Sequence, residues 1–139
     1  MTVQTEHIEL RTNGEADTID ITDQVRSTIA ASGMRDGIAC IFAPGSTGGV
    51  TTIEFEPGCV SDLQGLFDRV APRNVDYEHH KRWGDGNGHS HVRAALLGPS
   101  LSVPFVEGEP TLGTWQQIIF VDFDNRSRSR RLVLQLVGE

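Results

Sequence analysis

The chain has 139 residues, of which 37% are hydrophobic and 22% charged, a composition that is typical of a globular protein and excludes a disordered one. This length predicts a single domain over residues 1–139 that needs neither a disulfide nor a metal in order to fold. The formal net charge of −7 disfavours nucleic acid and anionic membranes as partners, and two cysteines are too few for a secreted disulfide framework.

The N-terminal segment lacks the features of a targeting sequence. Its first seven residues contain neither a positively charged region nor an apolar stretch, so they do not resemble a signal peptide. No run in the chain approaches the ~20 apolar residues that cross a bilayer. We therefore expect a cytoplasmic protein that does not enter a membrane.

Two segments have the sequence pattern of helices. Thr22 is placed to cap a helix over residues 23–32, and Gly33 suits the position just after its last turn. Residues 61–64 read Ser-Asp-Leu-Gln, a capping-box pattern for a second helix that Pro72 would end. The apolar residues of this second helix share one stripe, which predicts core packing: Leu63, Leu66, Phe67 and Val70.

Most of the remaining chain has the composition and alternation of β-strands. The candidate strands are residues 5–12, 18–21, 37–42, 50–56, 101–106, 114–124 and 130–137. Short turns separate the last three strands, so they should pair antiparallel, because parallel neighbours need a long crossover. The grouping of strands apart from helices predicts an α+β fold, an antiparallel β-sandwich-like packing of sheets with two or three flanking helices.

Three further features have structural interpretations. Four arginines lie close together near the C-terminus and predict a solvated hairpin in preference to an anion or subunit contact: Arg126, Arg128, Arg130 and Arg131. Cys40 lies in an apolar run and is expected to be a small buried residue. Trp115 either lines a pocket or fills the core, and we favour the core.

Residues 71–90 fit neither a helix nor a strand pattern. They contain three glycines, two aromatic residues and three of the five histidines. A loop of this length in a small domain is usually either functional or disordered, and the aromatic residues favour the first alternative. We therefore expect the chemistry of this protein to lie in this segment.

The spacing of the histidines sharpens this expectation. Asn87 and His91 are four residues apart, so they share a face whether the backbone is helical or extended, whereas His89 joins them only in an extended segment. Near neutral pH an imidazole can be an acid, a base or a metal ligand, and an adjacent carboxylate can orient it. His79 and Asp85 are therefore candidates together with His91; alternatively, these side chains only hydrogen-bond the loop to itself.

A second candidate lies earlier in the chain. Residues 46–49 read Ser-Thr-Gly-Gly, a turn whose backbone N–H groups could bind an anion. The turn lacks the lysine of a nucleotide-binding P-loop, and a plain connection to the next strand is the alternative interpretation. Glu54, on that next strand, is either a site residue or a solvent-facing one.

Several motifs occur in one order along the second half of the chain. Residues 84–87 read Gly-Asp-Gly-Asn and are followed by His91, by Leu-Leu-Gly-Pro-Ser at 96–100 and by Leu-Gly-Thr-Trp-Gln-Gln at 112–117. This combination resembles the YjbQ-like family, whose members are loosely described as secondary thiamine-phosphate synthases. The resemblance covers about residues 37–138. It implies an antiparallel sandwich-like α+β fold, commonly a homotrimer, with a polar pocket near a subunit boundary.

The resemblance also implies roles for individual residues. The catalytic residues would be His79, Asp85, His91 and Glu54, and a divalent metal, Zn or Mg, would be held by His79, Asp85 and His91. The small phosphorylated substrate would contact Ser46, Thr47, Asn87, Arg93 and Gln116. The chain departs from the family pattern at Gly45, where many relatives have a histidine, and this removes one ligand or proton carrier.

The activity that the resemblance implies is thiamine-phosphate synthesis. This reaction joins a pyrimidine diphosphate to a thiazole phosphate with loss of pyrophosphate. Diphosphate chemistry favours Mg²⁺ on oxygen ligands, whereas two imidazoles favour Zn²⁺ or another transition metal. Two other functions therefore stay open, a non-catalytic trimer that binds a metal or metabolite, and a metal-dependent hydrolase.

Overall fold

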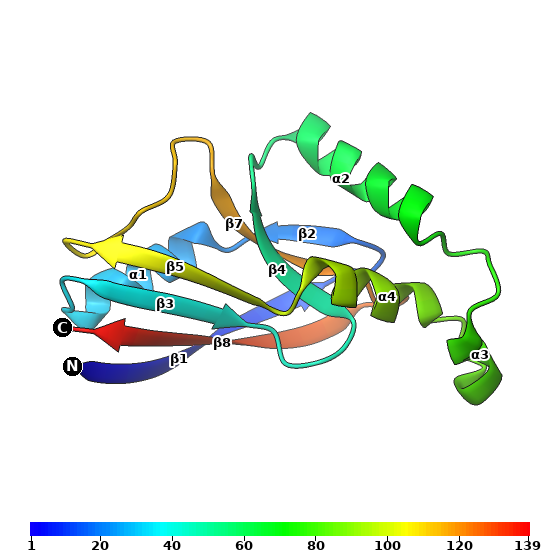
Figure 1. Ribbon diagram of the computed structural model, residues 1–139, viewed down its shortest axis with the longest axis horizontal. Coiled ribbons are helices and arrows are strands. Elements are labelled where there is room, and N and C mark those ends of the chain that lie inside the picture. The colour runs from blue at the N-terminus through cyan, green and yellow to red at the C-terminus, as the bar shows by residue number, and fades with distance from the viewer.

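The computed structural model describes residues 1–139, which form two β-sheets and four helices (Figure 1). The helices are α1 (Thr22–Ser32), α2 (Pro57–Val70), α3 (Glu78–Trp83) and α4 (Gly88–Leu97). The strands are β1 (Thr2–Thr12), β2 (Asp17–Asp20), β3 (Gly37–Phe42), β4 (Gly48–Ile53), β5 (Ser100–Val106), β6 (Glu109–Pro110), β7 (Gln117–Asp122) and β8 (Arg128–Gly138). No helix is both long enough and apolar enough to cross a bilayer. The predicted α+β class is confirmed, with four helices in place of the expected two or three.

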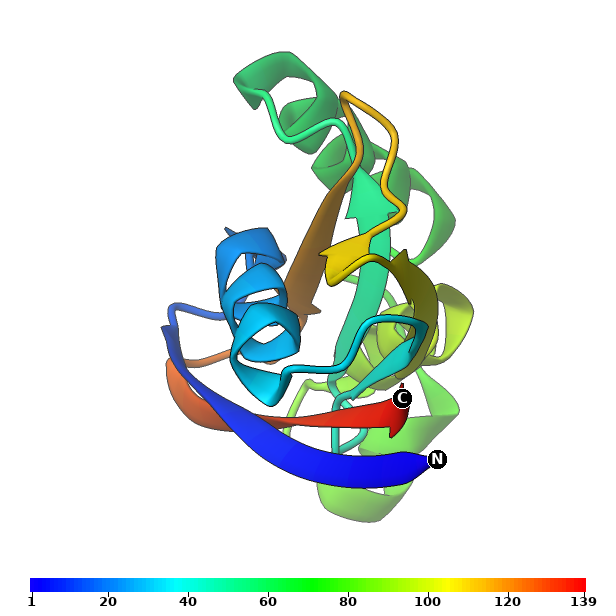
Figure 2. The same cartoon turned by 90° about the vertical axis from the view of Figure 1, so that its left-hand side faces the viewer.

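The two sheets contain only antiparallel pairs. The larger sheet has the strand order β1-β8-β3-β5-β6, and the smaller one has the order β2-β7-β4. β1 pairs with β8 along its whole length, from Thr2 opposite Gly138 to Thr12 opposite Arg128. Both chain ends therefore lie side by side, and the two long strands curve beneath α1 (Figure 2).

The central strand of the smaller sheet, β7, is buried on both faces. Successive side chains of a strand point to opposite faces, so its apolar run serves two cores. One face packs against β8 in the main core through Ile118, Phe120, Leu132, Leu134 and Leu136. The other face packs against α2 and α4 in a smaller core of Ile119, Val121, Phe123, Phe67 and Ala94. This second core fixes the position of α4 on the sheet.

The predicted strands are present, but two of them are shorter at the ends that matter for function. The strand expected over 50–56 is β4, which ends at Ile53, so Glu54 lies beyond it and is exposed. The strand expected over 114–124 is β7, which begins at Gln117. Trp115 lies in the preceding turn with 72% of its surface exposed, so the prediction of a core tryptophan was wrong.

The first predicted helix is confirmed and is held to β7 by its first residue. It ends at Gly33, whose φ of 73° is the left-handed conformation that glycine adopts readily. Thr22 is the first helical residue and not the cap. Its hydroxyl donates to Asp20 at 2.6 Å and accepts the N–H of Ile118 at 2.8 Å.

The second predicted helix begins earlier than its capping-box pattern indicated. α2 starts at Pro57, so the N-terminus predicted at residues 61–64 was wrong. The Glu56 carboxylate caps it by accepting the N–H groups of Gly58 and Cys59. Proline is favourable at the first helical position because its missing N–H would have no partner there.

The apolar stripe of α2 is only partly buried. Phe67 is 2% exposed, but Leu66 is 43% exposed and Val70 is 57% exposed, so the prediction that the whole stripe lies in the core was wrong. The helix does end at Val70, two residues before Pro72, as predicted. α2 contacts the smaller sheet mainly through one edge of its apolar face.

Two other structural interpretations need correction. Arg130 is not solvated, because its side chain is 14% exposed and binds Asp122, whereas Arg131 remains 63% exposed as expected. Cys40 is half-buried and lies 3.5 Å from the Ser100 hydroxyl, so it is not a core residue. In each case the deciding neighbour comes from another strand, Asp122 at the end of β7 and Ser100 at the start of β5.

Candidate functional site

The segment predicted to be an irregular loop, residues 71–90, instead contains α3 and the first turn of α4. Gly84 ends α3 with a φ of 63°. Gly88 begins α4, and a Cβ atom on it would lie 2.5 Å from the Cβ of Tyr77, so only glycine fits between the two helices. The close approach of α3 and α4 depends on these two glycines. The three glycines of the segment also obscured its helical pattern in the sequence.

Three predicted site residues come together where α3 meets α4. The His79 and His91 rings lie with their centroids 4.4 Å apart and a tilt of 34°. Nδ1 of His79 is 3.5 Å from Oδ1 of Asp85, in the loop between the helices. Two imidazoles and a carboxylate therefore adjoin one another.

The contact between His79 and Asp85 is too long for a good hydrogen bond. Nδ1 of His79 is buried and has no hydrogen-bond partner, although the side chain as a whole is 25% exposed. The Asp85 side chain is 47% exposed, and its Oδ1 accepts the N–H of Asn87 at 3.2 Å. No three His, Cys, Asp or Glu side chains have their donor atoms placed to hold a metal ion. The unpartnered nitrogen is thus available to a proton, a metal or a ligand.

A small cavity lies on the outer face of α4, next to this cluster. Its volume is about 180 Å³, and it is lined by Gly45, Ser46, Gly48, His91, Ala94, Ala95 and Pro99. Ser46 and His91, both predicted site residues, therefore share one cavity. At the position of the family histidine, Gly45 leaves this wall without an imidazole.

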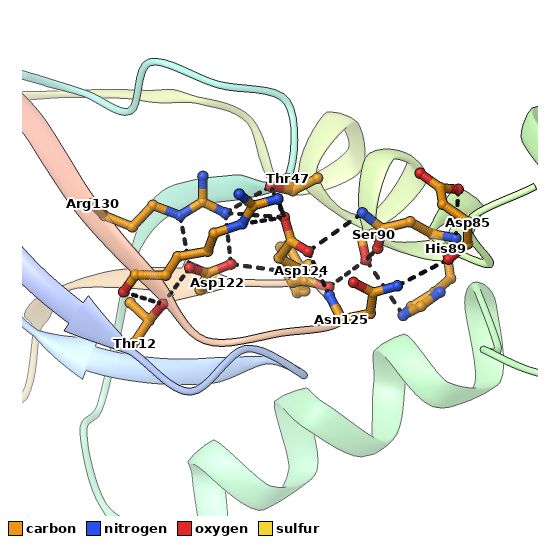
Figure 3. Close-up of polar contacts among 12 residues, drawn as sticks. Thr12, Thr47, Asp85, His89, Ser90, Asp122, Asp124, Asn125 and Arg130 are labelled. Atoms are coloured by element: carbon orange, nitrogen blue, oxygen red, sulfur yellow. Dashed lines mark hydrogen bonds and ion pairs between the residues drawn. The ribbon is translucent and has the colours of Figure 1, made fainter. Parts of the chain in front are cut away.

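A buried network of charges holds the turn before β4 and the start of α4, the two segments next to this cavity (Figure 3). Asp122 has no exposed surface, and its two carboxylate oxygens accept hydrogen bonds from Arg130 at 2.7 and 2.8 Å and from Thr12 at 2.6 Å. Burial alone would raise the pKa of the Asp122 carboxyl, but these hydrogen bonds outweigh it and hold the pKa below its ordinary value. The carboxylate is therefore ionised at neutral pH.

Asp124, two residues further on, joins both walls of the cavity. Its carboxylate accepts from Thr47 at 3.1 Å, in the turn before β4, and from Asn87 at 3.4 Å, at the start of α4. Arg128 binds the same carboxylate at 2.9 Å. Thr47 and Asn87, which were predicted to bind substrate, are each 6% exposed and hold these two walls in place.

The start of α4 is also attached to the backbone of β7. The Ser90 hydroxyl contacts the carbonyl of Phe123 and the side-chain oxygen of Asn87. Asn125 donates to the carbonyl of Asp85 at 3.1 Å, which fixes the loop before α4. These contacts fix the register of α4, in which His91 lines the same cavity as Ser46.

Three other predicted site residues lie elsewhere. Glu54 follows β4 at the end opposite to Gly48, about 20 Å along the strand at ~3.3 Å per residue. Gln116 is near that same far end, where it donates to Thr52 at 3.0 Å. Arg93 is buried on the other face of α4 and donates to Ala71 and Asp68.

Sequence reasoning missed the residues that support the site. Asp122 ends β7 and Asp124 lies two residues beyond it, while Arg128 and Arg130 lie at the start of β8. In each pair the two residues are two apart, which puts both side chains on the same side of an extended chain, and this spacing was the available signal. Reading the arginines as a solvated run concealed their acidic partners.

Comparison with known proteins gives the family of this chain. The family model described as "UPF0047 protein YjbQ-like" matches residues 6–139. A UPF0047 protein of Methanothermobacter thermautotrophicus is 37% identical over 139 residues, which is 100% of this chain and 95% of the relative. A UPF0047 protein of Mycobacterium tuberculosis is 41% identical over 116 residues, 82% of this chain and 85% of that protein.

Solved structures agree along the whole chain. A YbjQ-like protein of unknown function from Sulfolobus solfataricus is 30% identical with a TM-score of 0.94, and the alignment covers 99% of both chains. A YjbQ/UPF0047 family protein of Clostridium acetobutylicum is 34% identical with a TM-score of 0.87, over 95% of this chain and 99% of the other. The fold thus agrees with the sequence matches, and the chain belongs to the YjbQ-like UPF0047 family.

Proposed function

We propose that the protein is a small-molecule enzyme that acts on a phosphorylated substrate at the His79–Asp85–His91 cluster. The carrying observation is the buried Nδ1 of His79, which lacks a hydrogen-bond partner beside Asp85 and the His91 ring. A buried polar atom without a partner calls for an explanation, and a role toward a ligand is one of them. The cavity that Ser46 shares with His91 would hold the reacting part of the substrate.

The reaction class we propose is the thiamine-phosphate synthase type. In this reaction the C–O bond to the diphosphate of the pyrimidine breaks and a C–N bond to the thiazole forms, with pyrophosphate leaving as the anion. His79 and His91 would hold or move a proton at the leaving phosphate. The Ser46 hydroxyl is exposed in the cavity wall and would donate to a phosphate oxygen.

The chemistry of the donor set suits a divalent metal, because the unpartnered imidazole nitrogen of His79 lies beside the Asp85 carboxylate. His79, Asp85 and His91 would be its ligands once their donor atoms turned toward a common point, which they do not share in this structure. Two nitrogens and one carboxylate suit Zn²⁺ better than Mg²⁺. When bound, such an ion would neutralise charge on the phosphate oxygens.

We also propose that the protein is a homotrimer. Glu54 and Gln116 are too far from His79 to act with it in one chain, and a neighbouring copy could bring them to it. Large apolar side chains near the same end of the smaller sheet are exposed, with Trp115 at 72% and Phe55 at 41%. Burying them between copies would favour assembly. Light scattering should then give three times the 15.2 kDa mass of one chain.

The second candidate function is non-catalytic binding of a metal or metabolite at the same cluster. Gly45 favours it, because the cavity then has only the imidazole of His91 and lacks the second one that an enzyme could use to move a proton. Such a protein would bind phosphorylated ligands or Zn²⁺ without turnover.

Incubation with the pyrimidine diphosphate and the thiazole phosphate, with Mg²⁺ or Zn²⁺, tests these two functions. We expect the purified protein to form thiamine phosphate, detected by mass spectrometry, and His91→Ala and Asp85→Asn to abolish it. His7→Ala, on the exposed side of β1, is the matched control and should retain full activity. Product that forms equally with all variants would refute catalysis at this site. Ligand binding without product, lost in His91→Ala, would support the binding function instead.

A further inference from the structure

The inner face of α4 carries two buried ionisable residues that the proposed site does not use. His89 and Arg93 are four residues apart, so they lie on one face, and each is 2% exposed. His91 points away from this face, toward Ser46. Buried arginine and histidine are costly to desolvate, so their presence calls for a partner or a role.

Arg93 lines a second, separate cavity between α4, α2 and the β1–β2 turn, and His89 lies next to its Glu15 wall. Its volume is about 160 Å³, and it is lined by Glu15, Ala16, Gln64, Asp68, Arg73 and Arg93. A cavity of this size exceeds the ~10–15 Å³ that one water needs and is smaller than the ~300–1,000 Å³ of pockets for drug-sized ligands. The room and the polar lining suit a small ion with its water.

The turn that forms one wall is held in an uncommon conformation. Glu15 and Ala16 have φ values of 55° and 66°, in the left-handed region that residues other than glycine rarely occupy. Their N–H groups donate to the carbonyls of Asp124 at 2.7 Å and Asp122 at 2.8 Å, which keeps them there. Conformations of this kind concentrate at binding sites, because the surrounding structure must enforce them.

This turn aims Glu15 at the basic residues around the cavity. Its Oε2 lies 3.2 Å from Arg73 and 3.6 Å from Nε2 of His89. The other ring nitrogen of His89, Nδ1, is buried and has no hydrogen-bond partner. The buried imidazole thus has one nitrogen facing a carboxylate and one that is unused.

Arg93 has donor capacity left over. Its Nε donates to the carbonyl of Ala71 at 2.9 Å and its Nη2 to Asp68 at 3.0 Å, which leaves the remaining N–H groups of the fork without a hydrogen bond. Asp68 is 67% exposed and Glu15 is 37% exposed, so both carboxylates can turn to solvent. Arg73 and Arg93 would then present two guanidinium groups, whose geometry matches an oxyanion.

We propose that this cavity is a second binding site, for a small inorganic oxyanion of the phosphate or sulfate type, held by Arg73 and Arg93. The anion would replace the Glu15 and Asp68 carboxylates as the partner of the two arginines. The site lies on the opposite face of α4 from His91 and is independent of the proposed activity.

Sulfate is a suitable probe, because it is a small oxyanion whose charge does not change near neutral pH. Calorimetry on the full chain should show binding of inorganic sulfate. The backbone signals of Glu15 and Ala16 should shift in NMR spectra during the titration, because the anion takes the place of the Glu15 carboxylate at Arg73.

Arg73→Gln tests the site itself and should leave the fold intact, because Arg73 is 52% exposed. We expect its affinity for sulfate to fall at least about tenfold, the loss expected for one charge-assisted hydrogen bond. The matched control is Arg11→Gln, an exposed arginine on β1 that should bind as the wild type does. Absence of binding at millimolar sulfate, or equal loss in both variants, would overturn the proposal, the latter by showing diffuse surface attraction.

Discussion

The two faces of α4 use the same residue types in opposite ways. On the outer face, His91 is half-buried, adjoins His79 and shares an open cavity with Ser46. On the inner face, His89 is buried beside Arg93, and its pKa is lowered by burial and by that arginine. Two positions along a helix turn a side chain by about 200°, so neighbouring histidines meet different surroundings. The lesson is that a histidine-rich run can belong to two sites.

The largest effect should come from the charge network that supports both faces. Asp122→Ala would leave Arg130 buried without its bidentate partner, and breaking such a pair costs about 3–5 kcal/mol. Urea denaturation monitored by circular dichroism should measure this loss of unfolding free energy. The control is Arg131→Ala, which is on the same strand as Arg130 and removes an exposed ion pair with Glu9; it should cost at most about 1 kcal/mol. Equal losses of unfolding free energy would mean that the buried network contributes no more to stability than an exposed ion pair.

A smaller effect should separate the outer face from the inner one. In Gly88→Ala the added Cβ would press on Tyr77, and overpacking of this kind costs about 1–3 kcal/mol. The strain should shift α3 against α4 and part His79 from His91, so Zn²⁺ or substrate binding should weaken while sulfate binding at Arg73 persists. Gly113→Ala, where a Cβ makes only an ordinary 3.6 Å contact, is the control for thermal stability. Loss of both binding activities would contradict the separation.

The smallest effect should appear in the pH dependence of stability. The folded-state pKa of His89 is depressed, so between that value and the ordinary 6.5 the unfolded chain binds more protons. Stability should therefore be full above pH 6.5 and decline as the pH falls through that window. Unfolding in urea at several pH values should show a shallower decline in His89→Gln than in His91→Gln. The reverse order would mean that the outer histidine is the one buried in its neutral form.

The acidic limb of the same curve reports on Asp122. Its pKa is lowered in the folded state, so its contribution to stability is present above the ordinary value of 3.8 and is lost as the pH falls below it. This lower window separates the carboxylate from the histidine in a single series of measurements.

Much of the fold could be predicted because local patterns agree with the tertiary structure. In β8, Leu132, Leu134 and Leu136 alternate with more exposed residues, and the predicted strand is present. α2 was placed late because Glu56 caps it with a carboxylate in front of Pro57, while residues 61–64 imitated a start. Residues 61–64 do lie in this helix, but the helix begins earlier, at Pro57, with Glu56 as its cap.

The site was only partly predictable, because it depends on contacts between distant segments. His79, Asp85 and His91 lie near one another in the sequence, and helical and loop geometry brings them together. Whether Glu54 and Gln116 would reach them depended on the length of β4, which carries both to the far end. Arg93 was expected to bind a phosphate group of the substrate, but it lies on the inner face of α4 and donates to Asp68 instead.

The end of β7 has a consequence for how the two cavities open. The carbonyls of Asp122 and Asp124 hold the β1–β2 turn, and the N–H of Phe123 donates to Thr47 at 2.8 Å, beside the other cavity. Amide hydrogen exchange at Glu15, Ala16 and Phe123 should therefore occur in one cooperative opening event. A ligand that slows exchange at one cavity should slow it at the other, even though the two ligands never touch.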